Sequence, residues 1–106
     1  MADFALLYSG DGGMPETEEE TARVMKAWND WYEDLGKAIK DGGNPFGAAK
    51  TVGSDGSLRD GATGSPFTGY TILSAESLDR AAELAKGSPA LQGGGSITVY
   101  EIVEVM

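Results

Sequence analysis

The strands expected at the two ends of the chain carry apolar side chains on both faces. Residues 4–9 form a short apolar run before Gly10, and its side chains alternate between two sides: Phe4, Leu6 and Tyr8 on one, Ala5 and Leu7 on the other. Residues 96–106 form the last and longest run. One of its faces is apolar except for Glu101, and the opposite face holds Tyr100, Ile102 and Met106. A sheet made from such strands needs a cover on both faces.

Two helices are expected between these strands. The first begins with a capping box, in which Thr17 is the cap and Glu20 is the third residue of the first turn. The helix is expected to end near residues 41–43, and its apolar stripe, at helical spacing, contains Val24, Met25, Trp28, Trp31, Tyr32, Leu35, Ala38 and Ile39. The second helix is capped by Ser74 or Ser77 and stops at Gly87-Ser88-Pro89. One face of it carries Leu78, Ala81, Ala82 and Ala85.

The middle of the chain is expected to supply the remaining strands. Residues 48–53 are expected to form a short strand, followed by a hairpin-type turn at Ser54-Asp55-Gly56-Ser57 that leads to residues 58–60, and residues 67–73 form a further strand. Residues 61–65 and 92–95 read as loops. The resulting order, β-α-β-β-α-β, predicts a single α+β domain over residues 1–106. Its plan is ferredoxin-like, with an antiparallel sheet and two helices on one face.

Two helices can cover only one face of that sheet. The simplest cover for the other face is a second copy of the chain, related by a twofold axis. The sequence therefore predicts a homodimer whose sheets pack face to face. The alternative is a monomer that leaves a partly apolar face exposed to water.

Composition narrows the classes of function. The 106 residues include 17 acidic and 8 basic side chains, which gives a net charge of −9 and makes nucleic acids and anionic membranes poor partners. There is no cysteine and no histidine, which removes disulfides, thiol nucleophiles, imidazole general bases and the usual zinc ligands. No metal or cofactor is expected. No basic leader and no bilayer-length apolar run is visible, so a cytoplasmic protein is expected.

One run of residues identifies a family resemblance. Gly43-Asn44-Pro45-Phe46-Gly47-Ala48-Ala49-Lys50 is followed by Gly69-Tyr70 and by an alanine-rich helix that ends at Pro89. The chain thereby resembles the YCII-related (DGPF) family, whose characteristic run is Asp-Gly-Pro-Phe-x-x-x-Lys. The proline, the phenylalanine and the lysine coincide, whereas Gly43 and Asn44 replace the aspartate and the glycine.

The resemblance implies a dimeric α+β barrel, in line with the two-faced strands. Members of this family that carry a His-Asp pair have been suspected of enzymatic activity. This chain has no histidine, so that pair does not exist here.

Several residues are candidates for a ligand site, each with a structural alternative. Lys50 is interpreted as a cation for an anionic ligand or a Schiff-base amine, or else as a surface lysine. Glu101 interrupts an apolar strand face and is a candidate general base, or else a strand-edge ion-pair partner. The flat side chains expected to line a pocket, or else to pack in the core, are Trp28, Trp31, Tyr32 and Tyr70. Asn44 completes the set.

The leading hypothesis is a homodimeric small-molecule-binding or accessory module of undefined biochemical role, with its cleft between the first helix and the sheet. The alternative is a cofactor-independent enzyme of the lyase, isomerase or oxygenase type that acts on a small molecule in the same cleft. For that enzyme the candidates are Asn44, Trp28, Trp31 and a carboxylate, and no catalytic residue is assigned. A purely structural interaction protein is the third possibility.

Overall fold

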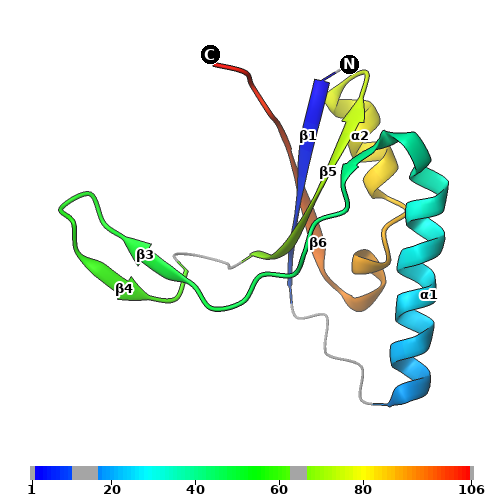
Figure 1. Cartoon of the computed structure of the whole chain (residues 1–106), viewed down its shortest axis with the longest axis horizontal. Helices are drawn as coiled ribbons and strands as arrows, with labels where there is room; N and C mark the ends of the chain where they lie inside the picture. Colours follow the sequence, from blue (N-terminus) through cyan, green and yellow to red (C-terminus); the bar gives the residue numbers. More distant parts are fainter. Residues whose placement is uncertain (1, 11–16, 63–66, 106) are drawn as a thin grey trace.

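The computed structural model describes residues 2–10, 17–62 and 67–105. These residues form a four-stranded antiparallel sheet, two α-helices and a separate two-stranded hairpin (Figure 1). The strands of the sheet, in the order β2-β5-β1-β6, are β2 (Ile39–Asp41), β5 (Phe67–Ala75), β1 (Ala2–Ser9) and β6 (Ser96–Glu101). The helices are α1 (Glu18–Leu35) and α2 (Leu78–Ala85), and the hairpin pairs β3 (Lys50–Val52) with β4 (Leu58–Asp60). Two short 3-10 turns complete the fold, η1 (Gly36–Ala38) and η2 (Pro89–Gly93).

The expected α+β architecture is confirmed, but the second strand of the sheet is not where the sequence placed it. Ile39–Asp41 pairs with β5, so Ile39 belongs to a strand and not to the helical stripe. The helix ends at Leu35 because Gly36 adopts φ +52° and its N–H bonds the carbonyl of Tyr32. The hairpin at 50–60 forms as expected. Among the described residues its two strands pair with each other and not with the main sheet, and in the sequence the hairpin lies between β2 and β5.

The helix caps follow the sequence closely. The Glu20 amide donates to Thr17 Oγ1 at 3.0 Å, as the capping box predicts. Ser77, and not Ser74, caps α2, because its hydroxyl accepts from the Arg80 amide at 3.1 Å. The Ser74 hydroxyl instead donates to Asp3 on the neighbouring strand. Neither α1 nor α2 has the length and apolarity needed to cross a bilayer.

The core lies between the two helices and one face of the sheet. Both helices therefore cover the same face, as Figure 1 shows. The buried apolar residues of this core are Phe4, Leu6 and Tyr8 of β1, Leu73 and Ala75 of β5, Trp31 and Leu35 of α1, and Ala81 and Ala85 of α2. Full burial of Phe4, Leu6 and Leu73 contributes about 1.5–3 kcal/mol each. The expected stripe was too wide at the start of α1, because Val24 and Met25 are exposed.

Among the residues that the structure describes, no helix lies on the opposite side of the sheet, and we call this side the helix-free face. It is formed by the alternate residues of β1, β5 and β6, which include Asp3, Ala5, Leu7, Tyr70, Ile72, Ser74, Thr98 and Tyr100. Most of these side chains are half-buried, whereas Thr98 and Tyr100 are exposed. The hairpin lies on this side in Figure 1, away from both helices. The two-faced character of β1 is therefore confirmed.

The last strand is shorter than expected. It ends at Glu101, although residues 96–106 were expected to continue as one strand. Beyond it the Ile102 amide still donates to the carbonyl of Asp3 at 2.9 Å. Ile102, Val103 and Val105 are exposed. Within the described part of the chain β6 pairs with β1 alone, so it is an edge strand of the sheet.

Candidate functional site

The aromatic residues of α1 pack into the core. Trp28 meets the rings of Tyr8 and Trp31 edge to face, with ring centres 5.4 and 5.6 Å away. The Trp31 indole N–H donates to the carbonyl of Leu84 at 3.2 Å, and the Tyr32 hydroxyl donates to the carbonyl of Gly42 at 3.1 Å. These rings occupy the space where the sequence placed a ligand cleft, and the polar edges of Trp31 and Tyr32 bond to backbone carbonyls.

A chain of hydrogen bonds crosses this core beneath the rings. The Tyr8 hydroxyl donates to Thr71 Oγ1 at 2.6 Å, and the Thr71 hydroxyl donates to the carbonyl of Gly42 at 3.0 Å. Burial raises the pKa of Tyr8 to about 12, although the bond to Thr71 acts in the opposite direction. Tyr8 is therefore a neutral phenol at physiological pH and joins β1 to β5 and to the segment after β2.

The segment that carries the Pro-Phe pair lies along the same edge of β5 as β2 does. The Tyr70 amide donates to the carbonyl of Asn44 at 3.3 Å, and the Phe46 amide donates to that of Thr68 at 2.8 Å. Gly43 adopts φ +78°, and a Cβ there would overlap the carbonyl oxygen of Tyr70. The run thus extends the edge begun by β2, and the Asn44 side chain is exposed beside it.

This pairing brings three side chains together on the helix-free face. The ring of Phe46 stacks on that of Tyr70, with ring centres 5.7 Å apart and planes 19° from parallel. The Tyr70 hydroxyl donates to Asp41 Oδ2 at 3.3 Å, and the Gly43 amide donates to Asp41 Oδ1 at 2.8 Å. We call these three residues the Phe46–Tyr70–Asp41 cluster. Of the three, sequence reasoning singled out only Tyr70 as a site residue.

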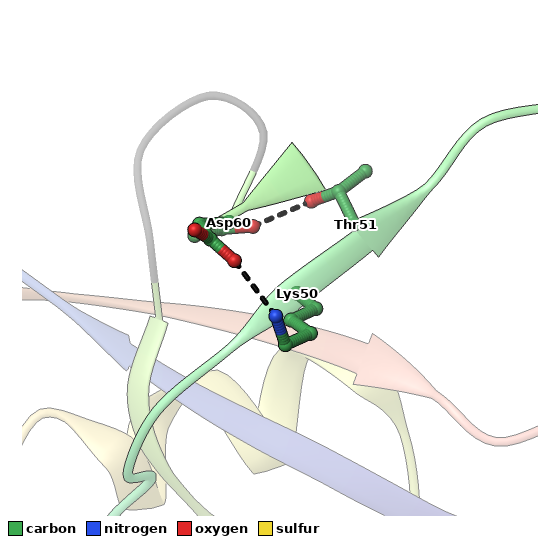
Figure 2. Close-up of polar contacts among 4 residues, drawn as sticks. Lys50, Thr51 and Asp60 are labelled. Atoms are coloured by element: carbon green, nitrogen blue, oxygen red, sulfur yellow. Dashed lines mark hydrogen bonds and ion pairs between the residues drawn. The ribbon is translucent and has the colours of Figure 1, made fainter. Parts of the chain in front are cut away.

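Lys50 lies in the hairpin, away from the aromatic candidates. Its amine forms an ion pair with Asp60 Oδ1 at 2.8 Å, and the two side chains are 68% and 91% exposed. Figure 2 shows this pair beside the hydrogen bond that the Thr51 hydroxyl donates to the carbonyl of Gly61. Both contacts join the two strands of the hairpin at its base. An amine so exposed lacks the burial that a Schiff-base lysine requires.

Glu101 stands at the end of β6, opposite Phe4 in the register. It points to the helix side of the sheet but is exposed, so its carboxylate is open to water. Glu101 was expected to interrupt an apolar strand face. At the end of β6 the helices do not cover that face, so its carboxylate stays in water. The structure thus separates Glu101 and Lys50 from the aromatic core, and brings Tyr70 together with Phe46 and Asp41.

Two of the three comparisons with known proteins found nothing: no family model matches the sequence, and no curated protein is significantly similar to it. Among solved structures, the chain is similar to 5-chloro-2-hydroxyhydroquinone dehydrochlorinase (TftG) from Burkholderia phenoliruptrix AC1100, in its complex with 2,5-dihydroxybenzoquinone. The TM-score is 0.57 at 18% sequence identity, over 96% of this chain and 94% of that one.

At this level of identity the likeness concerns the fold alone, and it supports the α+β architecture of the chain.

Proposed function

We propose that this protein is a cytoplasmic homodimer, a divergent YCII-related (DGPF-type) module that binds a small molecule on its helix-free face. Two copies would pack these faces together as a dimeric α+β barrel and enclose the ligand between them. The observation that carries the proposal is the difference between the two sides of the sheet. The helix side is filled by the chain's own aromatic rings, whereas the helix-free side leaves half-buried apolar side chains without a helix over them.

The chemistry of this face favours a second copy as its cover. Ala5, Leu7 and Ile72 are adjacent across β1 and β5 and carry no charge. Removing them from water stabilises association by about 25 cal/mol for each Å² of apolar surface. The net charge of −9 opposes association, but salt screens charges beyond about 8 Å at physiological ionic strength.

The hairpin supports the same arrangement. It lies on the helix-free side of the sheet, and its opposed residues Val52 and Leu58 are both exposed. A two-stranded hairpin alone in water is only marginally stable. A copy that packed on the helix-free face would lie next to this hairpin and give its apolar pair a surface to contact.

A role toward a small molecule is further supported by the structural neighbour. TftG is a dehydrochlorinase and was solved in complex with 2,5-dihydroxybenzoquinone. A cofactor-independent enzyme is therefore the second candidate function, of the lyase, isomerase or oxygenase type. The specific observation in its favour is that Asp41 places a carboxylate beside the Tyr70 phenol on the helix-free face, which pairs a proton acceptor with a proton donor.

An NMR titration of ¹⁵N-labelled protein with a set of small aromatic and aliphatic metabolites tests the proposal. The expected result is that amide shifts change in β1, β5 and β6 around Leu7, Ile72 and Tyr100. Leu7→Glu abolishes these changes, whereas Val24→Glu on the exposed part of α1 leaves them intact. Shift changes confined to α1, or none with any compound, would contradict the proposal.

A further inference from the structure

The Phe46–Tyr70–Asp41 cluster combines a flat apolar surface with a hydrogen-bonding edge. Phe46 contacts Tyr70 through one side of its ring, and 48% of the Phe46 surface stays exposed. A second aromatic ring can therefore stack on Phe46 without displacing Tyr70. Offset stacking of this kind contributes about 0.5–1.5 kcal/mol beyond the area it buries.

The cluster is held in place by backbone contacts. Asp41 lies in β2 and Tyr70 in β5, and Phe46 is fixed by the bond from its amide to the carbonyl of Thr68. The tight approach of Gly43 to the backbone of Tyr70 fixes the chain between Asp41 and Phe46. A ligand that binds here pays little to order the protein, because the groups already stand in position.

The polar edge selects the ligand's chemistry. Each carboxylate oxygen of Asp41 accepts one hydrogen bond, from the Tyr70 hydroxyl or the Gly43 amide, and each keeps a further lone pair. The site thus offers acceptors for an O–H or N–H donor on the ligand. The carboxylate, in a chain of net charge −9, repels an anionic ligand.

We propose that the Phe46–Tyr70–Asp41 cluster recognises a neutral or cationic planar ring that carries at least one hydroxyl or amine donor. This inference rests on the proposed function, because the second copy excludes water from the helix-free face and so strengthens the bond to Asp41. Phe46 supplies the stacking surface. Asp41 and the Tyr70 oxygen supply the acceptors. Aliphatic rings are rejected because they cannot stack on Phe46, and aromatic carboxylates are rejected because the Asp41 carboxylate repels them.

Four probes measured by NMR titration separate these requirements. Resorcinol has the planar ring and two hydroxyl donors, 1,3-dimethoxybenzene lacks the donors, cyclohexane-1,3-diol lacks the planar ring, and benzoate is an anion. We expect resorcinol to bind about tenfold more tightly than each of the other three. The amides that shift most are expected to be those of residues 41–46 and 69–71.

Three variants test which residues produce the preference for resorcinol. Phe46→Leu is expected to lower the affinity for resorcinol about tenfold, whereas Phe67→Leu, at a similarly exposed phenylalanine of β5, leaves that affinity unchanged. Asp41→Asn keeps the acceptor for the Gly43 amide but removes the charge, so the preference for resorcinol over benzoate falls to about twofold or less. Tyr70→Phe keeps the ring that stacks on Phe46, so it lowers the affinity for resorcinol by less than Phe46→Leu does.

The outcomes distinguish this inference from the proposed function. If probes shift amides of the helix-free face but the Phe46 and Asp41 variants bind them as the wild type does, the inference is wrong and the proposed function stands. If the protein is a dimer but resorcinol has no advantage over the other probes, the ligand class is wrong. If no probe binds and the protein is a monomer, both proposals fail.

Discussion

The ring of Phe46 lies on the ring of Tyr70, 5.7 Å from centre to centre and 19° from parallel. This contact joins the Pro-Phe run to β5 on the face of the sheet that carries no helix. The run follows the edge of β5 through backbone hydrogen bonds, so the Phe46 side chain lies on the helix-free side of the sheet and not in the core beneath the helices. The candidate site therefore lies opposite the cleft expected from the sequence.

Replacing Gly43 is expected to destabilise the fold. A Cβ at this position overlaps the carbonyl oxygen of Tyr70, and the positive φ is unfavourable for any other L residue. Chemical denaturation of Gly43→Ala should show a loss of more than about 2 kcal/mol in the free energy of unfolding. Gly47→Ala is the control, because a Cβ there meets nothing within 4 Å. Equal losses in the two variants would contradict the structure of this run.

The buried phenol of Tyr8 makes stability depend on pH in the alkaline range. Its pKa is about 12 in the folded protein and near 10 when unfolded, so the folded state favours the neutral phenol. The stabilising contribution is complete below about pH 10 and is lost as pH rises toward 12. When the pH is raised from about 9.5 to about 11.5, the free energy of unfolding measured by urea denaturation should fall by about 2 kcal/mol more in the wild type than in Tyr8→Phe. Equal losses in both proteins would exclude Tyr8 as the cause.

The hydroxyl of Thr71 is expected to contribute more to stability than an exposed hydroxyl of the same sheet. Thr71→Val removes the acceptor of the Tyr8 hydroxyl and one donor to the carbonyl of Gly42 while keeping the shape of the side chain. The expected cost is about 1–3 kcal/mol, because the buried Tyr8 hydroxyl loses its partner. Thr98→Val, at an exposed site on β6, should change the free energy of unfolding by less than about 0.5 kcal/mol. A cost for Thr71→Val no larger than for Thr98→Val would contradict this assignment.

Lys50 is expected to be dispensable. Its ion pair with Asp60 is exposed, and exposed pairs contribute about 0–1 kcal/mol. The free energy of unfolding of Lys50→Ala should therefore lie within about 1 kcal/mol of that of the wild type, and its affinity for resorcinol should be unchanged. Lys40→Ala controls for the loss of one positive charge. A selective loss of ligand binding in Lys50→Ala would restore this lysine as a site residue.

Local patterns in the sequence predicted much of the fold. The two faces of β1 follow from the alternation of its residues, and the caps at Thr17 and Ser77 follow from hydroxyl geometry over three residues. The position of β2 did not follow. Ile39 continues the helical spacing, whereas the positive φ of Gly36 ends the helix before it.

The candidate site depends on longer-range relations that no local pattern contains. Phe46 and Tyr70 meet because the run after β2 pairs with β5, and residues 50–60, which lie between them in the sequence, form the separate hairpin. Asp41 joins them through a side-chain bond to Tyr70 that depends on the same register. The aromatic spacing in α1 was equally consistent with a core and with a pocket wall, and only the packing of Trp28 and Trp31 separates the two.

The molar mass in solution is the most direct test of the central claim that a second copy covers the helix-free face. Light scattering across a size-exclusion column should give the mass of two chains for the wild type at physiological salt. It should give the mass of one chain for Leu7→Glu, whose far-ultraviolet circular dichroism remains that of the wild type. A wild-type protein with the mass of one chain would contradict the account, because the apolar side chains of the helix-free face would then remain in water.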